Sequence, residues 1–159
     1  MPSPLTCHIL DTVSGKPATN VVCAVYKLDL DNDTNNAIIK GETQVALAKT
    51  NDDGRVTEWV FEPSPAMRSE LRNLGILEKT PGKLEWDTLQ KGFYKIRFHT
   101  GSYFKQKNAR SFYPFVDIVF EVSDARHYHI PLLLSSYGYT TYRGSCKVGT
   151  TSTIVILGL

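Results

Sequence analysis

The chain has few cysteines, and they form no recognisable pattern. Among its 159 residues are only Cys7, Cys23 and Cys146. An odd number without repeated spacing argues against a disulfide framework, and a thiolate zinc site lacks the Cys-x-x-Cys pair it usually needs. Cys7 and Cys23 lie in apolar, strand-like segments, so we expect them to be small buried hydrophobic side chains.

Long apolar runs and concentrated charge are missing too. No stretch of about 18 apolar residues occurs, so the sequence predicts no membrane span. The formal net charge is only +2, and the Lys and Arg residues are spread along the chain, which provides no basic patch for nucleic acid. The start Met1–Pro4 lacks the charged and apolar regions of a secretory signal, and Leu157–Leu159 is not a peroxisomal Ser-Lys-Leu address. We expect an intracellular protein, cytoplasmic or peroxisomal.

The remaining composition suits one domain built from strands. Apolar residues make up 42% of the chain and aromatic residues 11%. The aromatic residues alternate with polar ones instead of recurring at helical spacing, which favours β-structure. Short alternating or apolar segments separated by turn residues are typical of an all-β sandwich. The eight predicted strands cover residues 5–10, 21–28, 43–50, 55–62, 93–100, 116–122, 127–134 and 138–145.

Two short helices interrupt this pattern. Ser64 and Pro65 form a typical helix start, and Gly75 is a suitable C-terminal cap. Residues 102–110 have weaker helical character. Between the first helix and the next strand, residues 79–82 read as a loop. The segment 51–54, Asn-Asp-Asp-Gly, predicts a tight turn that places Arg55 at the mouth of a hairpin.

The most informative segment is 127–134, His-Tyr-His-Ile-Pro-Leu-Leu-Leu. Side chains alternate along a strand, so His127 and His129 share one face while Tyr128 and Ile130 point to the core. Two imidazoles that titrate near neutral pH on a rigid strand suit a functional site. The segment 139–145, Tyr-Thr-Thr-Tyr-Arg-Gly-Ser, follows closely and adds a cation and a hydroxyl.

Further candidates are His8, Arg55, Arg143 and Ser145, each of which alone has an ordinary structural interpretation. Together with the His-x-His pair they are compatible with three chemistries. They could hold zinc in an open site, form a metal-free hydrolytic centre in which arginine stabilises negative charge, or bind an anion without chemistry. A serine nucleophile is poorly supported because no Gly-x-Ser-x-Gly motif is present.

Three motifs give the sequence a resemblance to a known family. Residues 5–18, which begin Leu-Thr-Cys-His-Ile-Leu-Asp, resemble the opening motif of the 5-hydroxyisourate hydrolases, the transthyretin-related enzymes. Residues 50–55 look like their second motif, and 127–145, ending in Tyr-Arg-Gly-Ser, like their third. Residues 100–104 and 112–114 also fit.

The resemblance implies a two-sheet, eight-stranded transthyretin-like sandwich that assembles as a homotetramer, a dimer of dimers. It implies hydrolysis of 5-hydroxyisourate in urate degradation, with no cofactor and no metal. The family's catalytic residues correspond to His8, Arg55 and His129. Three motif positions on the substrate side of the site correspond to Ser145, His127 and Tyr142.

The physical properties of these residues agree with that activity. Arg55 offers a planar fork of donors to a small heterocycle that can carry negative charge. His8 and His129 can position a water, deprotonate it and return a proton to the released ring nitrogen. Which histidine is the base stays open at this point. The alternatives are a transthyretin-like carrier without catalysis and a zinc hydrolase.

The sequence departs from the family pattern in two places. Residues 63–86 form an insertion between strands, where added length costs little free energy. In the family the chain usually ends at the serine of Tyr-Arg-Gly-Ser, whereas here residues 146–159 follow. We therefore expect a single hydrolase domain over 1–145, with a C-terminal extension over 146–159 that makes Ser145 an internal residue.

Overall fold

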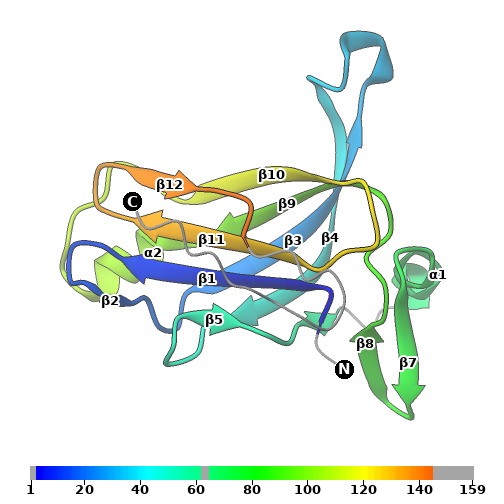
Figure 1. Ribbon diagram of the computed structural model, residues 1–159, viewed down its shortest axis with the longest axis horizontal. Coiled ribbons are helices and arrows are strands. Elements are labelled where there is room, and N and C mark those ends of the chain that lie inside the picture. Colours follow the sequence, from blue (N-terminus) through cyan, green and yellow to red (C-terminus); the bar gives the residue numbers. More distant parts are fainter. Residues whose placement is uncertain (1–2, 62–64, 145–159) are drawn as a thin grey trace.

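Two β-sheets face each other across one core, as the sequence predicts (Figure 1). The computed structural model describes residues 3–61 and 65–144. The first sheet contains β1 (Leu5–Asp11), β2 (Lys16–Pro17), β5 (Arg55–Val56), β11 (Tyr128–Leu134) and β12 (Tyr139–Thr141). The second contains β3 (Val22–Leu30), β4 (Ile39–Lys49), β6 (Val60–Phe61), β9 (Gly92–Phe98) and β10 (Val116–Val122).

The alternation of side chains along β1 and β11 fixes which face meets the core. In β1, Leu5, Cys7 and Ile9 are fully buried, while the residues between them are half-buried on the outer face. In β11, Tyr128 and Ile130 are buried and His129 lies on the outer side. The predicted faces of β11 and the predicted burial of Cys7 are confirmed. His8 and His129 therefore lie on the outer face of the sheet, and the opposite face packs against the core.

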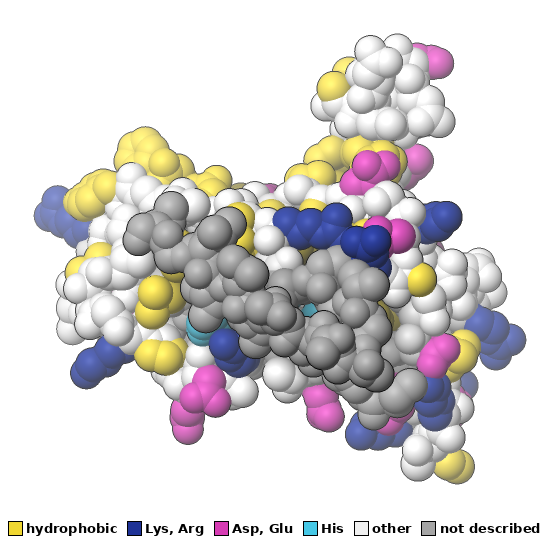
Figure 2. All heavy atoms as spheres, viewed as in Figure 1, with side chains coloured by type: hydrophobic (Ala, Val, Ile, Leu, Met, Phe, Trp, Pro, Cys, Tyr) yellow, Lys and Arg dark blue, Asp and Glu magenta, His cyan; other side chains and the backbone are white. Residues whose placement is uncertain are grey.

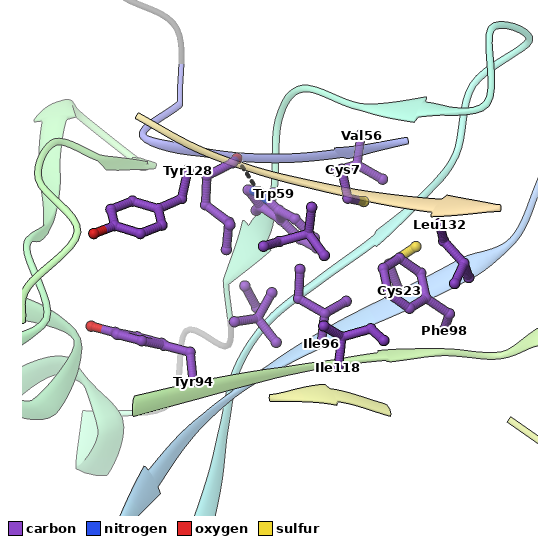
Figure 3. Packing of buried hydrophobic residues seen from close by; sticks show 14 of the residues in the cluster. Cys7, Cys23, Val56, Trp59, Tyr94, Ile96, Phe98, Ile118, Tyr128 and Leu132 are labelled. Atoms are coloured by element: carbon purple, nitrogen blue, oxygen red, sulfur yellow. Dashed lines mark hydrogen bonds between the residues drawn. The ribbon is translucent and has the colours of Figure 1, made fainter. Parts of the chain in front are cut away.

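The core is filled by side chains from both sheets, which meet between the strands (Figure 3). Phe98 of β9 and Leu132 of β11 are fully buried, and burial of a side chain of this size stabilises the fold by about 1.5–3 kcal/mol. The indole of Trp59 donates a 2.8 Å hydrogen bond to the carbonyl of Leu5. That bond satisfies the one polar atom of a buried Trp side chain and fixes the start of β1.

The first and last long strands of the first sheet are neighbours. β1 pairs with β11 in parallel, with Thr6 opposite His129 and Cys7 opposite Ile130. On its other side β1 pairs with β5 in antiparallel fashion, with His8 opposite Arg55. Parallel strands cannot be joined by a tight turn and need a longer connection. Here the connection between β1 and β11, which carry His8 and His129, is most of the chain.

The segment between β6 and β9 contains more structure than the sequence predicted. Helix α1 (Pro65–Asn73) forms as expected, but the predicted loop over 79–82 is the turn of a hairpin between β7 (Ile76–Thr80) and β8 (Lys83–Trp86). Gly75 separates helix from hairpin with φ of 87°, and a Cβ there would lie only 1.8 Å from the carbonyl oxygen of Thr88. The turn signal at Pro81-Gly82 was correct, but the short polar strands beside it gave no periodicity to detect.

Other boundaries differ in detail. The strand predicted over 55–62 is split into β5 and β6, which pair in different sheets. Helix α2 (Thr100–Gln106) begins and ends earlier than the predicted 102–110. The described residues contain twelve strands against the predicted eight, because β2, β5 and β6 are two-residue pairings and β7–β8 is an added hairpin. The all-β class and the two-sheet sandwich are confirmed.

The β3–β4 hairpin extends beyond the sandwich as a separate arm, with the short 3-10 helix η1 (Asn32–Thr34) near its tip (Figure 1). On the face shown in Figure 2, Lys and Arg side chains are spread over the surface, with Asp and Glu among them. Within 3–61 and 65–144, neither helix has the length and apolar character that a membrane crossing requires.

Candidate active site

The outer face of the first sheet brings together side chains that are far apart in sequence. β1 supplies Thr6 and His8, β5 supplies Arg55, and β11 supplies His129. Pairing of β1 with both neighbours places Thr6 beside His129 and His8 beside Arg55. The arrangement follows from strand register, because a shift of one residue would turn every one of these side chains into the core.

A single hydroxyl links the two histidines at the start of β11. Oγ1 of Thr6 lies 2.9 Å from Nε2 of His127 and 2.8 Å from Nδ1 of His129. Both distances are within hydrogen-bonding range. The two rings are thus anchored to β1 through one atom, and Nε2 of His129 is the ring nitrogen outside this bridge.

His8 and His129 lie close enough for their charges to interact. Their ring centroids are 6.4 Å apart, and their planes are inclined by 30°. Two imidazoles at this separation disfavour double protonation, so a proton bound by one opposes a proton on the other.

Burial and positive neighbours keep these rings neutral. Burial, followed by the charges of Arg55, His8 and His127, lowers the pKa of His129 to about 4. Burial and then Arg55 also lower the pKa of His8, although the backbone and side chain of Asp53 oppose the shift. Neutral imidazoles at pH 7 can accept a proton, and the guanidinium beside them can bind a negative group.

The segment after β12 closes over His129. The Gly144 amide donates a 3.0 Å hydrogen bond to the carbonyl of His129. A Cβ at Gly144 would lie 2.6 Å from Cδ2 of His129 and 2.7 Å from its carbonyl oxygen. Real Cβ atoms do not approach other atoms so closely, so glycine is what allows the chain to pass against the ring. Nearby, the Thr141 hydroxyl donates to the carbonyl of Pro131 at 2.8 Å.

The remaining predicted residues have different surroundings. Tyr142 is exposed. The guanidinium of Arg143 lies 4.8 Å from the ring centre of Tyr128 and 4.0 Å from Oδ1 of Asp124. Arg143 thus contacts Tyr128 at the start of β11 and Asp124 in the segment before it. Ser145 lies outside the described residues.

Thr6 is the site residue that sequence reasoning did not single out. Thr6 shares the outer face of β1 with His8, but a strand threonine by itself carries no chemical signature. Its role becomes visible only when β1 and β11 pair in parallel and bring its hydroxyl between His127 and His129.

Comparison with known proteins decides the family. Residues 5–144 match the HIUase/Transthyretin family. The chain belongs to this family. It is 38% identical over 141 residues to a probable 5-hydroxyisourate hydrolase of Schizosaccharomyces pombe, covering 89% of this chain and 90% of the relative. It is 34% identical over 144 residues to the 5-hydroxyisourate hydrolase of Mus musculus, covering 90% and 96%.

Solved structures of the HIUase/Transthyretin fold agree. The Klebsiella pneumoniae 5-hydroxyisourate hydrolase superposes with a TM-score of 0.57 at 26% identity, over 89% of this chain and 92% of that one. Transthyretin from Sparus aurata gives 0.61 at 24% identity, over 88% and 95%, and so shows likeness of fold alone. The family and the sandwich inferred from the three sequence motifs are both confirmed.

Within this family fold, the site of the present chain contains a pair of neutral imidazoles, His8 and His129, whose pKa values are lowered by burial and by the charge of Arg55. No group of three or more His, Cys, Asp or Glu side chains close enough to hold a metal ion occurs among the residues described. Nε2 of His127 and Nδ1 of His129 both lie within hydrogen-bonding distance of the hydroxyl of Thr6, which leaves Nε2 of His129 outside that bridge. This geometry suits proton transfer to and from a bound anion or a water.

Proposed function

We propose that this chain hydrolyses 5-hydroxyisourate to 2-oxo-4-hydroxy-4-carboxy-5-ureidoimidazoline, a step in urate degradation. The observation that carries the proposal is the pair of neutral imidazoles, His8 and His129, beside the guanidinium of Arg55. The names of the Schizosaccharomyces pombe and Mus musculus relatives point to the same activity. No metal or cofactor takes part in the proposed reaction.

The reaction is the addition of water to a ring carbonyl followed by cleavage of the bond between that carbon and the ring nitrogen, which opens the ring and keeps the nitrogen in the product. An imidazole removes a proton from water as the oxygen attacks the carbonyl carbon. The carbon–nitrogen bond then breaks, and the nitrogen takes up a proton from the imidazolium. This cycle leaves the histidine pair unchanged, as general acid–base catalysis requires.

Arg55 has two tasks in this scheme. Its planar fork binds the small anionic heterocycle, and its charge favours the oxyanion that forms on attack. A preorganised donor of this kind lowers such a barrier by roughly 3 kcal/mol. Burial is the main cause of the low pKa of His129, and the charge of Arg55 lowers that pKa further, so the ring is neutral before the reaction.

Ser145, His127 and Tyr142 are proposed to contact substrate from the side of the site formed by the end of β11 and the segment after β12. His127 is linked to His129 through Thr6, and Tyr142 is exposed two residues before Gly144. Both positions are compatible with contact to a ligand held at His129.

The assay generates 5-hydroxyisourate from urate in situ and follows its ultraviolet decay with and without the protein. Decay should be much faster with the wild-type chain and unaffected by a chelator. Decay at the spontaneous rate would contradict the proposed function and favour a transthyretin-like carrier. Loss of activity with chelator, together with bound zinc by metal analysis, would favour a zinc hydrolase instead.

We further propose a homotetramer, a dimer of dimers. Among the described strands, β10 and β12 end their sheets, and they carry the exposed Val119 and Tyr139. Unpaired edges with apolar side chains are suited to pairing with a second copy. Light scattering after size-exclusion chromatography tests this, and a monomer at assay concentration would contradict it.

The division of the chain into domains and the cellular compartment of the protein also stay predictions. We propose that residues 1–145 form the hydrolase domain and that residues 146–159 are a C-terminal extension. Comparing the full chain with one ending at Ser145 tests that division: much higher activity in the shorter chain would make the extension inhibitory, and loss of the tetramer would make it structural. Cytoplasmic or peroxisomal location is tested by imaging a tagged chain.

A further inference from the structure

The bridge made by Thr6 restricts the protonation of both histidines that it joins. A threonine hydroxyl has one proton to donate and accepts through its oxygen. It lies 2.9 Å from Nε2 of His127 and 2.8 Å from Nδ1 of His129. If it donates to one ring, the other ring must supply an N–H to it. The tautomers of the two rings are therefore linked through a single proton.

Two arrangements satisfy this bridge. In the first, Thr6 donates to Nδ1 of His129, so the proton of that ring sits on Nε2. In the second, Thr6 donates to Nε2 of His127 and accepts from an Nδ1–H of His129, which leaves a lone pair on Nε2 of His129. Only the second arrangement makes His129 a base toward a ligand, because only then can Nε2 accept a proton.

The charge around the site favours the second arrangement. Arg55 is a cation with donors only, and its charge acts on His129. A positive neighbour attracts a ring nitrogen that carries a lone pair and repels one that carries an N–H. Nε2 of His129 is the ring nitrogen outside the Thr6 bridge. The charge of Arg55 therefore favours the arrangement in which Nε2 carries the lone pair and Nδ1 carries the proton.

We propose that Thr6 is a positioning residue that fixes His129 as the Nδ1–H tautomer, by donating its hydroxyl proton to His127 and accepting from His129. His127 then acts through Thr6 as the acceptor that orients the hydroxyl. When Nε2 of His129 takes a proton from water, Nδ1–H keeps donating to Thr6, so the bridge needs no rearrangement. The inference rests on the proposed function for the catalytic use of this tautomer.

The direct test is the protonation of the His129 ring in protein without substrate. Imidazole proton–nitrogen correlation spectra of the ¹⁵N-labelled full chain, recorded near pH 8, distinguish Nδ1–H from Nε2–H. Wild-type His129 should be predominantly Nδ1–H. Thr6→Val, which keeps the β-branched shape, should move the ring toward Nε2–H, and Thr6→Ser should restore the wild-type state. His127→Phe, which removes the acceptor, should act like Thr6→Val.

Activity supplies the second readout. Thr6→Val should lower kcat/KM by about 10-fold or more, because part of the protein then holds the wrong tautomer, while Thr6→Ser should stay close to wild type. A matched control is Thr12→Val, which removes the hydroxyl bonded to the carbonyl of Leu134 at the far end of the strand pair. It should leave both the tautomer and kcat/KM unchanged.

Two results would overturn the inference: a wild-type His129 that is Nε2–H, or an Nδ1–H state that persists in folded Thr6→Val. The melting temperature shows whether each variant is folded, and His127→Phe provides an independent variant if Thr6→Val is not. If wild-type protein fails to accelerate 5-hydroxyisourate decay, the proposed function fails. The ring spectra still decide whether Thr6 sets the tautomer.

Discussion

The backbone of Gly144 lies directly against the ring of His129. Its amide donates to the His129 carbonyl at 3.0 Å, and a Cβ at this position would come within 2.6 Å of Cδ2. The segment that follows β12 is therefore packed against a residue that we place at the centre of the reaction. Small changes there should affect catalysis more than folding.

Gly144→Ala should reduce kcat/KM by about 10-fold or more, because the new methyl group must displace either the chain or the imidazole. The matched control is Gly138→Ala in the same β11–β12 hairpin, where a Cβ would meet only Oγ of Ser135, at an ordinary contact distance of 3.7 Å. Steady-state kinetics and melting temperatures of both variants measure the difference. Equal activity of the two variants would contradict close packing of Gly144 on His129.

His129→Asn should lower kcat by about 100-fold or more, since loss of a general base typically costs that factor. His99→Asn serves as the control, because His99 lies before α2 and has Arg97 and Asp117 as its charged neighbours. The ultraviolet assay compares the two. Turnover near wild type in His129→Asn would show that His129 is not part of the acid–base pair.

Arg55→Gln should raise the pKa values of both His8 and His129, because it removes a positive charge that lowers both. Arg55→Lys keeps the charge and should leave these pKa values nearly unchanged, yet it should raise KM because the bidentate fork is lost. Titration of the ring signals by NMR separates the two effects. Unchanged pKa values in Arg55→Gln would contradict the electrostatic role.

The low pKa of His129 should also make the fold less stable in mild acid. Its pKa is about 4 in the folded protein against an ordinary 6.5, so between these values the unfolded chain binds a proton that the folded protein does not. The contribution to stability is complete above about pH 6.5 and is lost as the pH falls toward 4. Urea unfolding measures the free energy of unfolding at pH 7.5 and at pH 4.5. The decrease between these two pH values should be smaller in His129→Asn than in wild type. An equal loss in both proteins would contradict the linkage.

Tyr103→Phe should destabilise the fold by about 1.5–3 kcal/mol, the usual cost of losing a hydrogen bond to a charged group. The Tyr103 hydroxyl donates to Oδ2 of the buried Asp11 at 2.7 Å, which joins α2 to the end of β1. Tyr137→Phe, at a tyrosine that is 69% exposed, should change stability little. Urea unfolding measures the free energy of unfolding of both variants. Equal changes in the two would show that the hydrogen bond between Tyr103 and Asp11 does not stabilise the fold.

Much of the fold could be predicted because local pattern and burial agree. Alternation along β11 correctly placed His129 on the outer face and Tyr128 and Ile130 in the core, since one face of the strand had to be apolar. The β7–β8 hairpin was missed because its short strands show no repeating pattern, although Ile76 and Trp86 are buried and the Trp86 indole donates to the carbonyl of Leu74 at 3.2 Å. A two-residue strand such as β5 likewise exists only through its neighbour β1.

The charged and titratable residues of the candidate site could be predicted from the sequence, but Thr6 and Gly144, which contact His129, could not. His8, Arg55 and His129 could be named because their side chains have distinctive chemistry. The link through Thr6 depends on the parallel register of two strands, which no spacing along the chain specifies. The close approach of Gly144 is likewise a property of three-dimensional packing.

The parallel pairing of β1 with β11 also determines when a newly made molecule can become active. Thr6 and His129 are separated by 123 positions in the chain. At a synthesis rate of about 5–20 residues per second, the ribosome needs roughly 6–25 s to pass from one to the other. During that interval β1 lacks its long neighbour and its backbone edge is unpaired, as happens in proteins dominated by distant contacts. Translation must therefore reach the C-terminal strands before any catalytic centre exists, and a truncated product that stops earlier is inert.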